Sequence, residues 1–326
     1  MRAAIADLPA QVRSADVWPD VDVIMPIRNE ADDLRTAIDT VLAQEYPGTM
    51  SVVLAVGPSD DGTEALARSI AAADDRVLVV DNPVGITPAA LNAAIGAGSA
   101  PVIVRVDGHS ELSDGYVRRA VETMRRTGAV NVGGLQVPVP TTPFEEAVAA
   151  ATTSWLGTGG ASYRVGGAEG AVDTVYLGVF DRAAVEAVGG FDERLIRNQD
   201  YELNIRLRQA GGEVWFDPEL SVGYRPRGSW GALWRQYLEY GRWKAVVMRM
   251  HPESTRVRQV VPPLGIVGVV LGLLVGLRFR PALILPVVYL STLTAAIVGA
   301  RRPLVAPVLG CIHTAWATGF VSSIRR

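Results

Sequence analysis

Short apolar runs alternate with helix-like segments through the first hundred residues of the chain. The runs have the length of buried strands, and they cover residues 21–25, 51–56, 76–80 and 101–106. Between the first two runs, Leu34, Ile38 and Leu42 recur at helical spacing. We therefore predict an α/β domain with an open parallel sheet and crossover helices. Ligands of such sheets bind at the carboxyl ends of the strands, so the polar residues after each run are candidates for a site.

The last third of the chain contains three long apolar stretches without acidic residues, at 260–277, 281–300 and 303–324. Each is close to the ~20 mostly apolar residues that a membrane-spanning helix needs. We therefore predict about three transmembrane helices within residues 259–326. Pro262 and Pro263 leave open a re-entrant first segment followed by two spans. A buried hairpin of a soluble domain is a further alternative, which the scarcity of charge disfavours.

The segment before these stretches combines aromatic and basic residues. One helical face carries Trp230, Leu233, Trp234 and Tyr237, and basic residues lie among them at Arg235, Arg242, Lys244 and Arg249. This pattern is typical of an amphipathic helix in the headgroup region of a membrane, and we predict one within residues 229–258. The alternative is an ordinary helix whose apolar face packs against a protein core.

Charge is divided unevenly along the chain, although the net charge is only −3. The first 223 residues sum to −15, whereas the part from Tyr224 onward carries 14 Lys and Arg against two acids and sums to +12. A basic, apolar C-terminal part favours a membrane surface as the partner. We expect no nucleic-acid ligand.

The single cysteine, Cys311, excludes an internal disulfide, as is usual for proteins of a reducing compartment. Residues 1–19 contain acids and no long apolar core, unlike a secretory signal. We expect them to form an N-terminal tail. The body that follows is expected in the cytoplasm, attached to the cell (inner or plasma) membrane by a multi-pass C-terminal segment.

Asp107 and His109 follow the fourth apolar run and are candidates for a metal site. They lie two residues apart, so both side chains can point from one extended segment into one crevice. A carboxylate and an imidazole suit a divalent metal that bridges phosphates, and Mn²⁺ tolerates an imidazole better than Mg²⁺. An ordinary Asp-Gly surface turn is the alternative. The chain lacks the glycine patterns of dinucleotide-binding and P-loop proteins.

Four stretches occur in an order that resembles a known family: VDVIMPIRNEADDLRTAIDTVLAQEYP, VRVDGHSEL, GGFDERLIRNQDYELNIRLRQAGG and RQYLEYGRWK. Together they resemble the family 2 inverting glycosyltransferases of the GT-A fold, above all the membrane-attached exopolysaccharide enzymes of the succinoglycan ExoA type. The resemblance covers roughly residues 20–250. It implies a GT-A domain at 20–228, an α/β fold whose Rossmann-like, mostly parallel sheet has flanking helices, followed by the transmembrane segment.

The resemblance places five residues at the sugar donor: Pro26, Arg28, Glu30, Asp61 and Asp107. Asp107 and His109 stand at the two ends of the family's metal-binding D-x-D motif, which implies Mn²⁺ or Mg²⁺ as cofactor. A UDP-sugar is the expected donor. Val56 and Gly57 occupy the places of two acids, one of which contacts uracil in the family, so other nucleotides stay open.

The NQDYE stretch places Asp200 at the family's catalytic base, with Gln199 where a Glu usually stands. Inverting transfer needs one carboxylate to take the proton of the acceptor hydroxyl as it attacks in line. A carboxylate near a helix start stays ionised, although Asp200 could merely cap its helix. Gln236, Arg242 and Trp243 match an acceptor-side Q-x-x-R-W motif, with wider spacing.

The implied function is transfer of a sugar from a nucleotide-sugar to a hydroxyl of a lipid-linked or polysaccharide acceptor. The chain would be a hexosyltransferase of exopolysaccharide or cell-envelope glycan synthesis, with the donor, the acceptor and membrane lipids as partners. Two alternatives remain. One is a polyprenyl-phosphate sugar synthase, whose acceptor is the lipid phosphate. The other is a catalytically silent membrane scaffold that keeps the fold.

Overall fold

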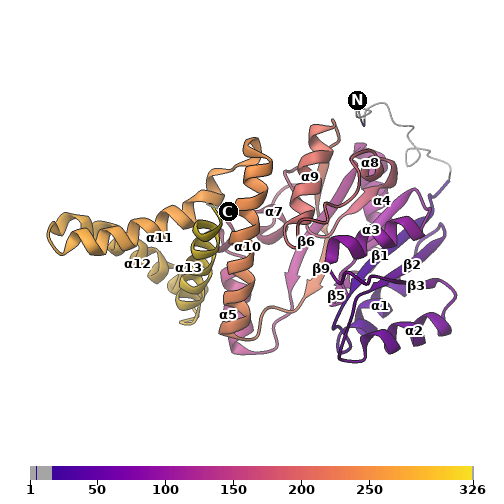
Figure 1. The fold of residues 1–326 in the computed structure, drawn as a ribbon, viewed down its shortest axis with the longest axis horizontal. Helices are drawn as coiled ribbons and strands as arrows, with labels where there is room; N and C mark the ends of the chain where they lie inside the picture. Colours follow the sequence, from indigo (N-terminus) through magenta and orange to yellow (C-terminus); the bar gives the residue numbers. More distant parts are fainter. Residues whose placement is uncertain (1–4, 6–16, 325–326) are drawn as a thin grey trace. The chain divides into compact units, whose positions relative to one another are not determined.

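The computed structural model of the chain describes residue 5 and residues 17–324 (Figure 1). Contacts divide the chain into two compact units. The first unit combines the residues up to Val137 with Gly166–Tyr224, and the second combines Pro138–Val165 with the residues from Arg225 onward. The segment Pro138–Val165 lies inside the predicted 20–228 domain, yet it belongs with the C-terminal helices.

A nine-stranded sheet forms the first unit, with strand order β3-β2-β1-β4-β8-β6-β9-β5 and β7 paired with β9. The strands are β1 (Val21–Ile27), β2 (Met50–Val56), β3 (Val77–Asp81), β4 (Val102–Arg105), β5 (Ser110–Leu112), β6 (Asn131–Pro138), β7 (Gly170–Ala171), β8 (Val179–Asp181) and β9 (Val214–Tyr224). Neighbours among β3, β2, β1 and β4 are parallel, as the four apolar runs predict.

The sheet as a whole is mixed, which corrects the expectation of a mostly parallel sheet. Strand β8 enters between β4 and β6 and runs antiparallel to both, and β5 and β7 run antiparallel to β9. Crossover helices join the first four strands and keep them parallel. Each antiparallel pair includes a strand that comes later in the chain.

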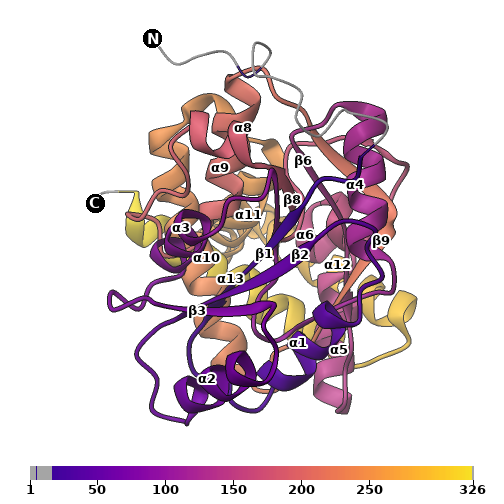
Figure 2. The ribbon, with the colours of Figure 1, turned by 90° about the vertical axis from the view of Figure 1, so that its right-hand side faces the viewer.

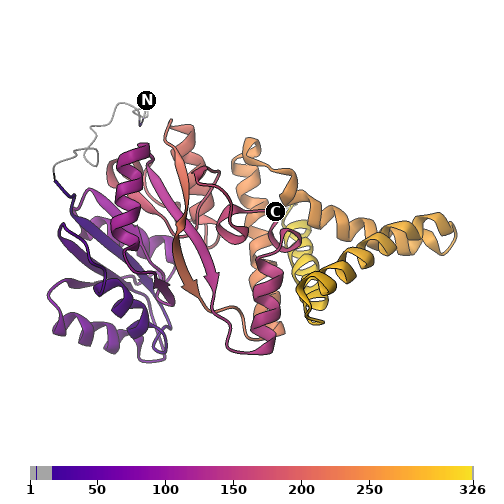
Figure 3. The ribbon, with the colours of Figure 1, turned by 180° about the vertical axis from the view of Figure 1, so that it is seen from behind.

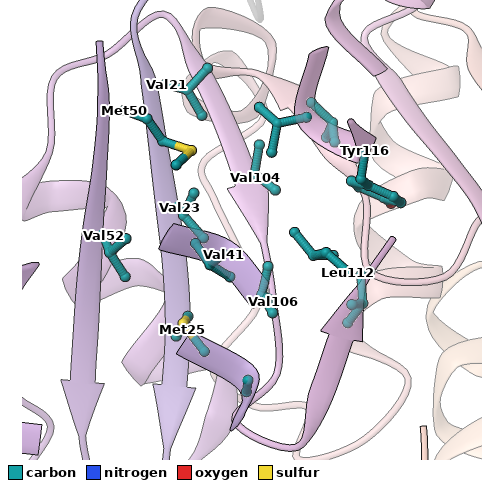
Figure 4. Packing of buried hydrophobic residues seen from close by; sticks show 14 of the residues in the cluster. Val21, Val23, Met25, Val41, Met50, Val52, Val104, Val106, Leu112 and Tyr116 are labelled. Carbon is teal, nitrogen blue, oxygen red and sulfur yellow. The ribbon is translucent and has the colours of Figure 1, made fainter. Parts of the chain in front are cut away.

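Helices cover both faces of this sheet, because the side chains of each strand alternate between two cores. Helices α1 (Leu34–Leu42), α2 (Thr63–Ala73) and α4 (Tyr116–Thr127) bury their apolar residues in one core, and α3 (Thr87–Ala97), α8 (Arg182–Ala187) and α9 (Gln199–Gln209) in the other. Figure 2 shows β1, β2 and β3 side by side. Figure 4 shows Val21, Val23 and Met25 of β1 in the same core as Val41 and Val104. The alternation fixes the register that brings the ends of β1, β2 and β4 to one edge.

The second unit is helical, and three of its helices are long and apolar enough to cross a membrane. Its elements are α5 (Pro143–Thr152), α6 (Trp155–Thr158), α7 (Ser162–Val165), α10 (Trp230–Met250), η2 (Pro252–Ser254), α11 (Val257–Gly276), η3 (Arg280–Leu283), α12 (Ile284–Ala300) and α13 (Val305–Ser323). The candidate spans cover Gln259–Gly276, Arg280–Ala300 and Val305–Ser323. Helices α11 and α12 run side by side (Figure 3). Most of their large apolar side chains are exposed.

Helix α10 packs against α13 through two glycines. A Cβ atom at Gly241 would lie 2.2 Å from the carbonyl oxygen of Trp316, and one at Gly319 would lie 2.0 Å from that of Leu238. The face predicted to meet lipid is divided, because Leu233 and Tyr237 are buried in the core shared with α5 and α13, whereas Trp230 and Trp234 are exposed. An interfacial position for α10 stays a prediction.

Candidate active site

The loops after β1 and β2 are joined by a set of short hydrogen bonds. The N–H groups of Glu30 and Ala31 donate to Thr63 Oγ1 (2.8 Å) and Asp61 Oδ2 (3.1 Å). Asp61 Oδ1 accepts from both the N–H and the hydroxyl of Thr63, at 3.0 and 2.5 Å. The Thr63 hydroxyl and the Ala31 N–H lower the pKa of Asp61, so this carboxylate is ionised. Asp61 thus links the loops after β1 and β2 through hydrogen bonds. A direct contact of Asp61 with the donor stays a prediction.

Arg28 crosses from the end of β1 to the loop after β3. Its Nη1 donates to the carbonyl of Gly85 at 2.9 Å. Gly57, after β2, comes so close to this loop that an added Cβ would lie 3.3 Å from the Cα of Gly85. Pro26 lies in β1 opposite Ala55 of β2. The predicted donor residues Pro26 and Arg28 therefore lie at the carboxyl end of β1, and a glycine directly follows the neighbouring strand β2.

His109 contacts the loop after β1 through Glu30, since its Nδ1 lies 2.9 Å from Glu30 Oε1. Gly108 permits this approach, because an added Cβ would lie 2.9 Å from Ile27 Cδ1 and 3.0 Å from Glu30 Cγ. A carboxylate that accepts the Nδ1 proton fixes the neutral tautomer in which Nε2 binds a metal. Glu30, a predicted donor-binding residue, is thus in contact with His109, a predicted metal ligand.

Arg105 is a functional candidate that sequence reasoning missed. It ends β4, is 4% exposed, and lies between the two carboxylates on which the predicted chemistry depends. Its Nε and Nη2 donate to Asp107 Oδ1 at 3.1 and 2.9 Å, and its Nη1 pairs with Asp200 Oδ1. The signal in the sequence was an arginine at the end of the apolar run PVIVRV, where a buried strand rarely carries charge without a partner.

The charge of Asp107 follows from this pairing. Burial raises the pKa of the Asp107 carboxyl, but the effects of neighbouring groups, led by the nearby charge of Arg105 and including its hydrogen bond, outweigh burial and hold the pKa below its usual range. Asp107 is therefore an anion. Both hydrogen bonds from Arg105 go to Oδ1, which leaves Oδ2 outside them.

Asp200 lies in the first turn of α9, as predicted. The chain enters this helix through Asn198, whose φ of 62° lies in the left-handed region. Asp200 and Glu202 are both acidic residues of the first turn, and Gln199, which replaces the expected Glu, is buried. A negative charge at this helix end is favourable, so Asp200 is suited to remain ionised.

The structure places the predicted acceptor residues on α10, in the second compact unit. Gln236 donates to Tyr240 Oη at 3.2 Å. Arg242 is exposed, and Trp243 is half-buried. Their part in acceptor binding stays a prediction.

Asp107 and His109 fit a metal that is completed by substrate oxygens. The described part of the chain contains no group of three or more His, Cys, Asp or Glu side chains placed to hold an ion. A divalent ion that takes one or two protein ligands and several phosphate or water oxygens matches this set. The carboxylate of Asp107 and the oriented imidazole of His109 are ligands that Mn²⁺ accepts.

Comparisons with known proteins identify the family and the fold of the chain. The family model "Glycosyl transferase family 2" matches residues 22–189. The succinoglycan biosynthesis protein ExoA of Rhizobium meliloti (strain 1021) is 33% identical over 91% of this chain and 93% of its own length. A mannosyltransferase from Pyrobaculum calidifontis, solved with GDP-Man and Mn²⁺, superposes with a TM-score of 0.66 at 18% identity, covering 95% of this chain and 91% of the other. GalNAc-T7, solved with UDP, GalNAc and Mn²⁺, gives a TM-score of 0.52 at 16% identity over 74% of this chain and 52% of the other.

Proposed function

Since the chain belongs to glycosyl transferase family 2 and is a glycosyltransferase of exopolysaccharide or related glycan synthesis, we propose that it is membrane-bound and inverting. The proposed reaction moves a sugar from a nucleotide-sugar to a hydroxyl of a lipid-linked or polysaccharide acceptor. The observation that carries the proposal is the position of Asp107 and Asp200. Although nearly a hundred residues apart in the sequence, both contact the guanidinium of Arg105.

Asp200 is the proposed general base. Its carboxylate accepts the proton of the acceptor hydroxyl while the acceptor oxygen bonds to the anomeric carbon from the side opposite the leaving group. The bond from that carbon to the phosphate oxygen breaks, and the nucleoside diphosphate leaves with the electron pair. A carboxylate that stays ionised is a weak base, so its contribution depends on placement.

Asp107 and His109 are the proposed residues for Mn²⁺ or Mg²⁺. When bound, the ion neutralises the charge that develops on the leaving diphosphate. Glu30 orients His109 for this purpose by accepting its Nδ1 proton. The Mn²⁺ in both related structures supports the choice of a divalent ion.

Pro26, Arg28, Glu30 and Asp61 form the proposed donor side, together with Asp107. A UDP-sugar is the expected donor, and UDP in the GalNAc-T7 structure supports it. GDP-Man in the Pyrobaculum enzyme supports a guanine nucleotide instead. Val56 and Gly57 provide no acid for a uracil ring, so the donor must be identified by direct comparison.

Helices α11, α12 and α13 are the proposed membrane anchor, and the catalytic unit is proposed to face the cytoplasm. The three candidate spans and their exposed apolar side chains support membrane attachment. The aromatic and basic residues of α10 support an interfacial position for that helix. Acceptor binding by Gln236, Arg242 and Trp243 would then take place near lipid.

The test is sugar transfer by the full-length protein in detergent, with UDP-, GDP- and TDP-sugars and Mn²⁺, Mg²⁺ or EDTA. We expect one donor to be consumed only with a divalent ion. Asp107→Asn should weaken donor binding, whereas Asp200→Asn should bind donor and lose transfer by at least about a hundredfold. Transfer to polyprenyl phosphate alone would identify a polyprenyl-phosphate sugar synthase. A protein that binds and consumes no donor would contradict the proposal and favour a silent scaffold.

A further inference from the structure

Arg105 is a buried cation shared by two carboxylates of the proposed reaction. Its side chain is 4% exposed, whereas those of Asp107 and Asp200 are 20% and 28% exposed. Nε and Nη2 of Arg105 contact Asp107, and Nη1 contacts Asp200. One guanidinium therefore uses its three nitrogens to join the end of β4 to the start of α9.

The sheet fixes Arg105 itself. Its backbone N–H donates to the carbonyl of Gly178 at 3.0 Å, and within β4 it is in register with Ile24 of β1. The guanidinium is planar and rigid, so its nitrogens point in fixed directions once the side chain is buried. Fixing Arg105 therefore also fixes where each paired carboxylate oxygen lies.

Asp200 lies in the first turn of α9 and is partly exposed. The helix backbone alone therefore allows its side chain more than one rotamer. The pair with Arg105 removes this freedom. Asp200 Oδ1 is buried at the guanidinium. Oδ2 is therefore the oxygen that an acceptor hydroxyl can reach.

We propose that Arg105 is a positioning residue that holds Asp200 with Oδ2 toward the acceptor and ties this orientation to the donor-side carboxylate Asp107. The inference rests on the proposed function of Asp200 as the base. Arg105 takes no proton and contacts no substrate in this role. Its effect is to hold the carboxylate of Asp200 at a fixed position relative to the donor site. The acceptor hydroxyl is then aligned for in-line attack on the anomeric carbon when the donor is bound.

Arg105→Lys tests this role, because lysine keeps the cation but replaces the planar fork by a single ammonium. We expect kcat for transfer to fall by about tenfold to a hundredfold, while the Kd for the nucleotide of the active donor changes less than about threefold. In an Asp200→Asn background the same change should lower residual transfer no further, because the base it positions is gone. The proposal would be overturned if Arg105→Lys had the kcat of the wild type. It would also be overturned if the fold-loss in kcat of the double variant equalled the product of the two single fold-losses.

Arg182→Lys is the matched control. Arg182 is also a buried arginine of the first unit, and its Nη2 donates to Asp22 Oδ2 at 2.7 Å at the opposite, amino-terminal end of β1. Its replacement should lower the unfolding midpoint without changing kcat for the folded fraction. A merely structural Arg105 would behave in the same way.

Thermal unfolding of the full-length protein in detergent gives a test that needs no transfer. Arg105→Met and Asp200→Asn should each lower the midpoint, and the double variant should be lowered by less than the two shifts together, because each single change leaves a partner unpaired. Additive shifts would overturn the pairing. If the wild type transfers no sugar, the proposed function fails, and this cycle still decides whether Arg105 and Asp200 interact.

Discussion

At the scale of single residues, the contact between Glu30 and His109 determines which nitrogen of His109 would face a metal. With Nδ1 of His109 held 2.9 Å from Glu30 Oε1, Nε2 would be the nitrogen left for a metal if His109 is a ligand. Asp107 supplies an ionised carboxylate nearby in the sequence. In the proposed site Asp107 and His109 would bind the ion directly, and Glu30 would only orient His109. The affinity of such a site for an ion depends on that orientation.

Glu30→Ala should weaken the apparent affinity for Mn²⁺ by about 10- to 100-fold, because His109 loses the partner that orients it. The measurement is a titration of Mn²⁺ in the presence of UDP or GDP, followed by electron paramagnetic resonance of the free ion. Glu45→Ala is the control, since Glu45 is exposed on a loop outside the site. An unchanged affinity in the Glu30 variant would contradict the orienting role of Glu30.

The sequence pattern predicted some of these residues and missed others for physical reasons. Asp107 and His109 follow a strand exit, where the pattern of apolar residues stops, so they were visible as candidates. Arg105 was missed because a charged residue at the end of an apolar run looks like the first exposed position. Its burial comes from β8 and α9, which lie far along the chain and leave no mark on the local pattern.

At the scale of elements, the contact of α10 with α13 depends on the two glycines that bring their backbones together. Small residues let two helix backbones approach closely, and this close packing stabilises the pair. Gly241 and Gly319 provide this reciprocally, since each faces a carbonyl of the other helix.

Gly319→Ala should lower the stability of the helical unit by about 1–3 kcal/mol, because its Cβ would lie 2.0 Å from the Leu238 carbonyl oxygen and the helices must separate. Thermal unfolding in detergent measures the change. Gly310→Ala is the matched control on the same helix, where an added Cβ has no neighbour within 4 Å in the described structure. Equal midpoints for both variants would argue against the packing role.

Asp217 joins β9 to α4 and gives the sheet unit a dependence on pH. It is fully buried and accepts from Arg119 at 3.0 and 3.1 Å and from Thr123 at 2.8 Å. Burial raises the pKa of Asp217, but the hydrogen bonds from Arg119, Glu219 and Thr123 outweigh it, so the pKa lies below its unfolded value. The stabilisation is complete above the unfolded pKa, near pH 4, and is lost as the pH falls through the folded pKa.

Asp217→Asn should cost about 1.5–3 kcal/mol at pH 7, because Arg119 and Thr123 lose a buried charged acceptor, while Arg119, which is partly exposed, keeps its ion pair with Glu219. The cost should begin to shrink below about pH 4, the unfolded pKa, and should vanish once the pH has fallen through the lower folded pKa, where the native wild-type carboxyl also becomes neutral. Urea unfolding at several pH values measures both effects. A cost that does not vary with pH would mean that the lost interaction is steric rather than ionic.

Elements of the first third were predictable because parallel strands buried on both faces read as unbroken apolar runs. The sequence pattern did not predict that helix α5 packs against α13, because α5 has no distinctive apolar run. Its small apolar residues Ala147, Val148 and Ala151 are ordinary for any helix, and the residues they pack against lie on α13, from Val305 onward. A local pattern identifies a buried face and does not say what covers it.

At the scale of the whole molecule, the chain passes from the sheet unit to the helical unit, returns, and passes over again. Cutting the chain after the predicted catalytic domain therefore divides the helical unit. A fragment ending at residue 228 keeps α5 but removes α10 and α13, the helices that share its core.

A fragment of residues 1–228 should associate or precipitate, since the buried face of α5 is left without cover. A second fragment, ending at Tyr224 with residues 138–165 replaced by a short Gly-Ser linker, should elute as a monomer. Size-exclusion chromatography compares them at equal concentration. A monomeric 1–228 fragment would show that α5 finds other cover.

The divided helical unit also has a consequence for how the chain is made. The ribosome releases α5 well before α13, with the last strands of the sheet emerging in between. During that interval the apolar face of α5 has no permanent partner, and it gains one only after the C-terminal helices have been translated and, if they enter the bilayer, inserted. The core of the helical unit is therefore complete only after α13 has been synthesised, and a chain that stalls before Val305 would expose α5 to chaperones or proteases.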